Sequence, residues 1–190
     1  FRSGIRTPLR RKLCHQFYKE NPLTNAKELE TLVKECFGAE QREMHYFAIE
    51  LLGYHKNLWS KQTISLIEWM ITHKSWWDSV DSTNSHIIGK FFLQFPNYIP
   101  STTLKWNKSS DLWLRRMSIL FQLLYKEKTQ TDLLSKYIEN CQLEEDFFIR
   151  KAIGWALRSY AYTHKKWVIH FVKNHPLLST LSKREALKHC

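Results

Sequence analysis

The sequence predicts an all-α protein, an α-solenoid built from stacked antiparallel helix pairs. Three observations predict this fold class. Apolar residues recur at spacings of three and four rather than by alternation. Only five glycines and five prolines interrupt the 190 residues. A faint internal repeat runs along the chain, which is typical of helical arrays.

Apolar stripes place the first predicted helices. One stripe lies within residues 44–52 and another within 61–73, and their apolar residues are Phe47, Ile49, Leu51 and Leu52, then Ile64, Ile67, Trp69 and Met70. No pair of segments has the alternation and turn residues of a β-hairpin. We therefore expect helices throughout the chain.

The repeat is a helix centre formed by a small residue followed by Ile. It occurs at Ala48-Ile49, Ser118-Ile119 and Ala152-Ile153, at intervals of 70 and 34 residues. A fourth helix is therefore expected midway, near residue 84, in the segment 81–92. Partner helices are predicted at about 61–73, 100–107, 131–140 and 165–173, with turns at Pro22, Pro96, Pro100 and Pro176. Units of two helices and about 35 residues indicate a HEAT-like or TPR-like solenoid, which has a concave binding surface.

Length and composition predict one domain over residues 1–190. The hydrophobic fraction of 43% and charged fraction of 25% are ordinary for a globular protein, and no stretch reaches the roughly 20 apolar residues of a membrane span. The first residues include no methionine and no signal peptide, so we expect that the native start has been removed. Four widely separated cysteines without a CxxC motif favour a reduced, intracellular protein. The histidines form no ligand array, so no metal and no cofactor are assigned.

The charge distribution points to a polyanionic partner. The net charge is +11. Residues 1–20 contain six Lys or Arg against one Glu, residues 147–190 contain nine against one, and the middle of the chain contains 14 against 16. Two basic ends on a curved chain would line a basic groove for nucleic acid, because phosphate contacts release counterions. A solvated basic surface without such a partner is the alternative from charge alone.

The segment His73–Asp81 combines paired tryptophans with two acids. On a helix, Trp77 and Asp81 share one face. An indole face attracts a cation, and a carboxylate stabilises positive charge that develops on a sugar. The alternative is a core tryptophan and an acid that caps the following helix.

Two further segments combine arginines with apolar helices. In Asp111–Leu120, one arginine is expected to pair with Asp111 four residues earlier, which leaves the other for a phosphate. In Phe147–Tyr160, Trp155 lies between Lys151 and Arg158 on one helix face, a pattern that suits nucleic acid. Gly154 in mid-helix predicts a close approach by a neighbour or a ligand. Solvated arginines and a core tryptophan are the alternatives.

Together these segments resemble the AlkD family of DNA alkylation-repair glycosylases, which are built from HEAT-like helix pairs. The resemblance covers nearly the whole chain, and its most specific strings are SWWDSVD at 75–81 and IRKAIGWALR at 149–158; weaker ones are 4–8, 46–52 and 113–116. The resemblance also implies that the first helices of the family precede this segment of chain, so we expect them to be missing from it.

The resemblance implies a function for specific residues. Asp81 would be the catalytic carboxylate, and Trp77 and Trp155 would wall the cleft. Arg116 would hold the DNA backbone next to the lesion, with Arg158 and Lys74 as further phosphate contacts. The implied partner is double-stranded DNA that contains alkylated bases, N3-methyladenine or N7-methylguanine, bound by a monomer without drawing the base into a deep pocket.

Two rival functions remain at this point. A catalytically silent HEAT-like DNA-binding scaffold would not need an acid in a phosphate-lined cleft, where the acid repels DNA. A helical-repeat adaptor for other proteins would bind without dependence on nucleic acid or salt. Only the resemblance favours DNA over RNA.

Overall fold

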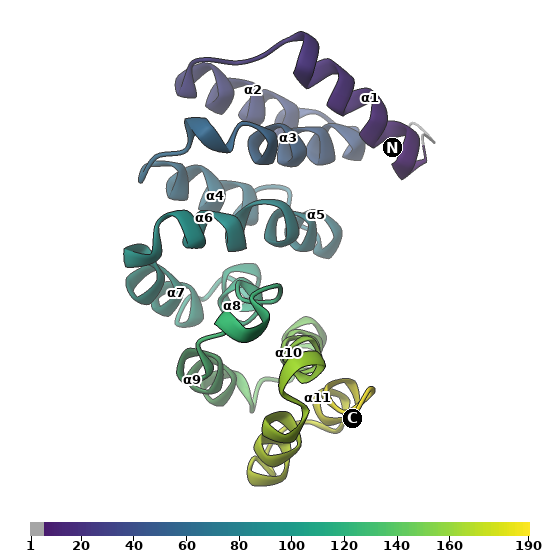
Figure 1. Cartoon of the computed structure of the whole chain (residues 1–190), viewed down its shortest axis with the longest axis vertical. Coiled ribbons are helices and arrows are strands. Elements are labelled where there is room, and N and C mark those ends of the chain that lie inside the picture. Colours follow the sequence, from purple (N-terminus) through teal and green to yellow (C-terminus); the bar gives the residue numbers. More distant parts are fainter. Residues whose placement is uncertain (1–5) are drawn as a thin grey trace. The chain divides into compact units, whose positions relative to one another are not determined.

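The structure, a computed structural model, describes residues 6–190, and within that range it is helical with no strand (Figure 1). The predicted all-α fold class of helix pairs is therefore confirmed. Gly4 and Ile5, which begin the string at 4–8, lie outside the described residues. The chain forms two compact units: unit 1 ends at Phe91, and unit 2 covers Phe92–Cys190. The prediction of one domain over 1–190 stays a prediction, as does the basic groove.

Unit 1 contains three long helices followed by shorter ones. Its elements are α1 (Thr7–Glu20), α2 (Ala26–Gly38), α3 (Arg42–Tyr54), the 3-10 turn η1 (Lys56–Leu58), α4 (Thr63–Thr72), α5 (Trp77–Thr83), the π-helical turn η2 (Asn84–Ile88) and α6 (Gly89–Gln94), which reaches the boundary. The predicted helices at 44–52 and 61–73 are α3 and α4. The segment 81–92 is helical as predicted, but the π turn, which a hydropathy pattern does not reveal, interrupts it.

Unit 2 repeats the helix-pair arrangement. Its elements are η3 (Pro96–Tyr98), α7 (Ile99–Asn107), α8 (Leu112–Leu120), η4 (Lys126–Lys128), α9 (Thr131–Cys141), α10 (Phe147–Asn174) and α11 (Thr180–Ala186). The backbone of α10 is non-helical at His164 (φ −132°, ψ 55°). Its second half is thus the separate partner helix predicted at 165–173. The partner helices predicted at 100–107 and 131–140 are α7 and α9.

Side-chain caps start several of these helices. Asn25 accepts the Lys27 N–H before α2, Asp111 accepts two N–H groups before α8, and Asp146 does the same before α10. Each cap satisfies backbone donors that the first helical turn leaves without a partner. The caps therefore fix where α2, α8 and α10 begin.

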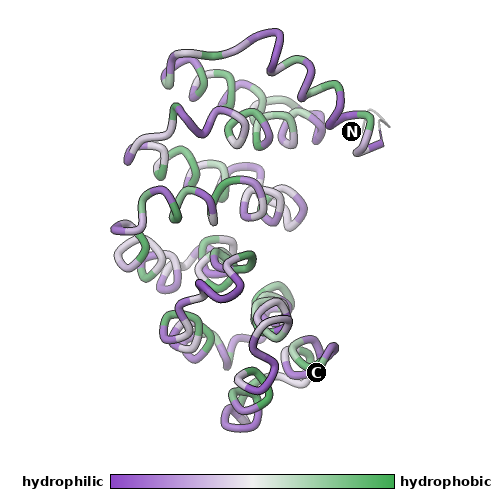
Figure 2. The backbone as a smooth tube through the Cα atoms, viewed as in Figure 1, coloured by the Kyte–Doolittle hydropathy of each residue, from purple (hydrophilic) through white to green (hydrophobic). Residues whose placement is uncertain are grey.

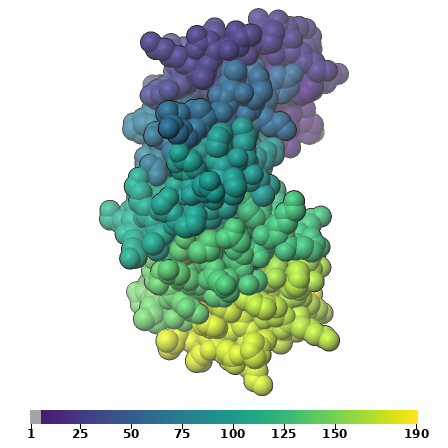
Figure 3. Space-filling view, turned by 60° about the vertical axis from the view of Figure 1, so that its left-hand side comes forward, coloured from purple at the N-terminus to yellow at the C-terminus, as the bar shows by residue number. Residues whose placement is uncertain are grey.

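Each unit buries its own apolar core. Hydrophobic and hydrophilic residues alternate along the helices (Figure 2), as expected for amphipathic helices with one buried side. Within each unit, segments close in sequence lie side by side in the space-filling view (Figure 3). The core of unit 1 includes Val33, Phe37, Ile49, Leu52, Ile67, Met70, Val80 and Ile88, and that of unit 2 includes Trp106, Met117, Leu120, Tyr137, Ile149, Ile153 and Leu157.

No helix within residues 6–190 is long and apolar enough to cross a membrane. The described part of the chain also contains no group of three or more His, Cys, Asp or Glu placed to hold a metal ion. Its four cysteines are free, and only Cys190 is exposed.

Candidate functional site

The turn between α4 and α5 carries the first group of predicted site residues. Lys74 has a positive φ of 43°, and its ammonium donates to the carbonyl oxygens of Gly38 (2.6 Å) and Ala39 (3.1 Å). These carbonyls end α2, where the helix dipole favours a cation. Lys74, predicted as a phosphate contact, is therefore bound to protein oxygens in this structure.

Asp78, the first acid of the turn, is held by three donors. Arg42 forms an ion pair with Oδ1, the Tyr46 hydroxyl donates to Oδ2 at 2.7 Å, and the backbone N–H of Ser79 donates to Oδ1 at 2.7 Å. Burial by itself raises the pKa of Asp78, but the Tyr46 hydrogen bond and the Arg42 charge outweigh it and hold the pKa below its ordinary value. We call Asp78, Arg42 and Tyr46 the Asp78 clamp.

Arg42 extends the clamp to the backbone of the turn. Its Nη1 donates to the Lys74 carbonyl oxygen at 3.2 Å and lies 3.1 Å from Nδ1 of the buried His45. The His45 ring in turn stacks on Phe37, with centroids 4.9 Å apart. The turn before α5 is thus fixed to α2 and α3, which sets the start of α5.

Trp77 and Asp81 lie four residues apart on α5, as predicted. Trp77 is 47% exposed and Asp81 is half-buried, whereas Val80 and Thr83 are buried in the core. A helix places residues four apart on one face. α5 therefore buries one side and presents Trp77 and Asp81 on another. Asp81 is thus distinct from Asp78, the acid that belongs to the Asp78 clamp.

Arg116 and Trp155 come together in unit 2. Arg116, on α8, is only 4% exposed, and its Nη1 donates to the Phe148 carbonyl oxygen at 2.5 Å. Its guanidinium carbon lies 6.0 Å from the centre of the Trp155 ring on α10, within range of a cation–π interaction. The predicted phosphate contact and the predicted aromatic wall of this unit are therefore neighbours.

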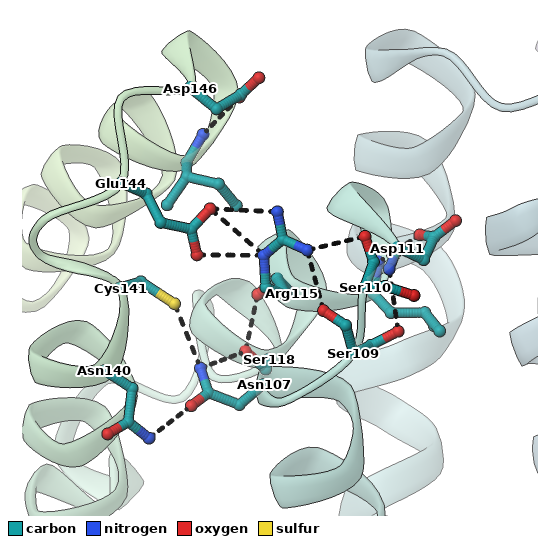
Figure 4. Close-up of polar contacts among 12 residues, drawn as sticks. Asn107, Ser109, Ser110, Asp111, Arg115, Ser118, Asn140, Cys141, Glu144 and Asp146 are labelled. Atoms are coloured by element: carbon teal, nitrogen blue, oxygen red, sulfur yellow. Dashed lines mark hydrogen bonds and ion pairs between the residues drawn. The ribbon is translucent and has the colours of Figure 1, made fainter.

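Arg115, in the first turns of α8, has a different partner from the one that the sequence predicts. It does not pair with Asp111, which caps the helix (Figure 4). Its guanidinium donates to Glu144 at 3.0–3.2 Å and to the carbonyl oxygens of Ser109 and Ser110 at 2.8 and 2.9 Å. Arg115 therefore holds together the loops before α8 and α10.

Glu185 on α11 gathers the two cations that flank Trp155. It forms ion pairs with Lys151 (3.1 Å) and with Arg158. The Lys151 hydrogen bond is the largest of the effects that lower the pKa of Glu185. A Cβ added at Gly154 would overlap the Glu185 Cβ, so the close approach predicted at this glycine is made by α11.

The structure thus gathers the predicted residues into two groups. Lys74, Trp77 and Asp81 lie together in unit 1, and Arg116, Trp155 and Arg158 lie in unit 2. The residues that position them leave no local sequence signal, because Arg42 and Glu185 act on residues 27 to 36 positions away.

Comparison with known proteins identifies the family. The protein is structurally similar to a predicted DNA alkylation repair enzyme from Enterococcus faecalis, with a TM-score of 0.89 and 32% identity over 98% of this chain and 86% of that one. The chain matches no curated protein. The sequence profile of the family described as DNA alkylation repair enzyme matches residues 2–190. The chain therefore belongs to the DNA alkylation repair enzyme family.

Proposed function

We propose that this protein is a DNA glycosylase that hydrolyses the N-glycosidic bond of cationic alkylated bases, N3-methyladenine and N7-methylguanine, in duplex DNA. The observation that supports it best is the face of α5, where the half-exposed Trp77 lies one turn from the Asp81 carboxylate. Membership of an alkylation-repair family supports the choice of substrate class.

The lesion itself makes the chemistry accessible to a single carboxylate. Methylation at N3 of adenine or N7 of guanine places a positive charge on the base, which weakens its bond to the sugar and makes it a good leaving group without protonation. Bond cleavage then creates oxocarbenium character at the anomeric carbon. An ionised Asp81 opposes that charge and orients the attacking water.

The tryptophans supply the second part of the proposed mechanism. The Trp77 ring packs against the sugar and attracts the cationic base, which contributes about 1–2 kcal/mol in a desolvated site. We propose the same kind of contact for Trp155 in unit 2. No deep base pocket is required, so the base need not be flipped.

The proposed phosphate contacts are Arg116, Arg158 and Lys74. Each of them donates to a protein acceptor in this structure. A phosphate would therefore either share the donors of these side chains or replace their present acceptors. Arg116 has a planar fork of donors that suits a phosphodiester.

Release of N7-methylguanine from duplex DNA tests the proposal. Asp81→Asn should lower the single-turnover rate by about 10- to 100-fold, because it removes the charge that stabilises the transition state. Asp132→Asn, at an exposed acid on α9, is the matched control and should release the base at the wild-type rate. Equal rates for Asp81→Asn and wild type would reject the assigned role. A wild-type protein that binds DNA but releases no base would be a silent scaffold.

A further inference from the structure

A cavity of about 320 Å³ in unit 1 is lined mainly by polar and basic side chains. It lies where α1, α3, the π turn η2 and the start of α6 meet. The side chains that bear on its chemistry are Arg11, His15, Glu50, Tyr54, His86 and Lys90. Of these residues only Glu50 lies within one of the strings that carry the resemblance, and none was predicted as a site residue.

The charge of this cavity is positive because its one acid is already paired. Arg10 donates both terminal nitrogens to Glu50, at 2.8 and 3.0 Å, in a nearly buried ion pair. Arg11 contacts Glu50 through Nε alone, at 3.3 Å. Within residues 6–190, the terminal nitrogens of Arg11 and the Lys90 ammonium make no hydrogen bond or ion pair. Two cations therefore face the cavity with donors available to a ligand.

Three arginines elsewhere in the protein are not available in this way. The guanidinium groups of Arg42, Arg115 and Arg158 are paired with Asp78, Glu144 and Glu185, respectively. An anion at those cations must compete with a carboxylate. Lys90 has no carboxylate partner among residues 6–190, and Arg11 shares only its Nε with Glu50. The remaining N–H donors of both side chains are therefore open to an anion, and Tyr54 lines the same cavity.

The backbone brings this cavity close to the proposed catalytic acid. Gly53 lets α3 approach η2 closely, since an added Cβ would lie 3.3 Å from the His86 carbonyl oxygen. The π turn η2 follows α5 directly and contains His86, and π turns are rare and frequent at functional sites. At about 1.5 Å per residue, His86 and Lys90 follow Asp81 by roughly 7 and 14 Å along the axis.

We propose that this cavity binds a phosphate group, and that the DNA backbone supplies it, a few nucleotides from the sugar at Asp81. The inference rests on the proposed DNA-binding function. Phosphates of one strand advance about 3.4 Å each along the duplex axis, so for a duplex that runs parallel to α5 and α6 roughly 7–14 Å corresponds to about two to four nucleotides. Arg11 and Lys90 thus bind the DNA strand beside the lesion, in addition to the contacts that the sequence predicts.

The test measures binding of an undamaged duplex as a function of salt. The pocket variant is Arg11→Gln with Lys90→Gln, and Lys90→Gln alone removes no side-chain hydrogen bond or ion pair made within residues 6–190. The matched control is Lys56→Gln with Lys61→Gln, two exposed lysines of the same unit. The pocket variant should flatten the slope of log affinity against log salt by about one to two units, and Lys90→Gln by up to about one. The control should stay near the wild-type slope.

A second arm distinguishes DNA from free phosphate. Inorganic phosphate, titrated against chloride at equal ionic strength, should shift the amide resonance of His86 in wild type and not in the pocket variant. Suppose that phosphate shifts the resonance in wild type but the pocket variant keeps the wild-type salt slope for DNA. The cavity would then bind free phosphate and not the DNA backbone, which overturns the DNA assignment. The DNA assignment is also overturned if the Lys56 and Lys61 control flattens the salt slope as much as the pocket variant does. It is likewise overturned if phosphate shifts no resonance in wild type and the pocket variant keeps the wild-type slope. Because an undamaged duplex loses no base, this result stands apart from the Asp81→Asn assay.

Discussion

Asp78 and Asp81 lie within one turn of α5, and the donors that hold Asp78 show its part in the fold. Asp78 is 13% exposed at its side chain and is bound by Arg42, Tyr46 and Ser79. Hydrogen bonds to a charged group contribute about 1.5–3 kcal/mol each. Asp78 therefore stabilises the turn that positions Trp77 and Asp81.

We expect Asp78→Asn to lower the free energy of unfolding at pH 7 by about 1–3 kcal/mol. The folded pKa of Asp78 lies below its ordinary value of 3.8, so its contribution is present above that value and is lost as the pH falls through the folded pKa. Urea denaturation of wild type and variant at pH 7 and at about pH 3 measures this. The difference should be smaller at the lower pH, and a constant difference would show that the charge of Asp78 is not the cause. Tyr46→Phe, which removes one donor, should give a smaller loss.

Arg116 has two roles to separate, because it is buried in the protein and is also proposed to hold a phosphate. Arg116→Ala should flatten the slope of log DNA affinity against log salt by about one unit. It should also reduce stability, since the Phe148 carbonyl oxygen loses its donor. Arg116→Lys keeps the charge and should keep the slope. A folded Arg116→Ala protein with the wild-type slope would assign Arg116 to the protein interior alone.

At the scale of elements, Gly154 explains how α10 and α11 come together. Gly154→Ala should lower the free energy of unfolding by up to about 2 kcal/mol, because overpacking costs about 1–3 kcal/mol and the better helix propensity of alanine recovers about 1. The added Cβ would overlap the Glu185 Cβ and lie 3.0 Å from the Ser182 carbonyl oxygen, so α11 must shift.

Gly38→Ala is the matched control for this substitution. Gly38 ends α2, and an added Cβ meets nothing within 4 Å. The free energy of unfolding of the Gly38→Ala variant should equal that of wild type or exceed it by up to about 1 kcal/mol. Chemical denaturation of the two variants side by side measures both effects. Equal stability of the two variants would contradict the role given to the contact between α10 and α11.

The elements also show what the sequence could and could not predict. Periodicity placed α3 and α4, because apolar spacing depends only on the helix itself, and the repeat placed the partner helices α7 and α9. The break at His164 agreed with a repeat that required a new helix from about 165. The predicted pairing of Arg115 with Asp111 was wrong. Local spacing favoured Asp111, whereas the fold brings Glu144, 29 residues away in the sequence, into contact with Arg115. Long-range polar partners of this kind leave no periodic signal.

At the scale of the whole molecule, the two units raise the question of whether the chain unfolds in one step. Helical repeats contact mainly their neighbours, so destabilisation can stay local. Each unit has its own buried core, and α11 packs on α10 within unit 2.

Hydrogen exchange of the Gly154→Ala variant answers that question. We expect amide exchange in residues 147–190 to rise roughly tenfold over wild type, because a loss of about 1.4 kcal/mol changes an opening equilibrium by that factor. Exchange in α3, at Arg42–Tyr54, should stay at the wild-type rate, since that helix packs within unit 1. An equal rise in α3 would show that residues 6–190 open as one cooperative body, which would support the single domain predicted from the sequence. A local rise would mean that the proposed residues of each unit, Asp81 in one and Arg116 in the other, are held by separately stable scaffolds.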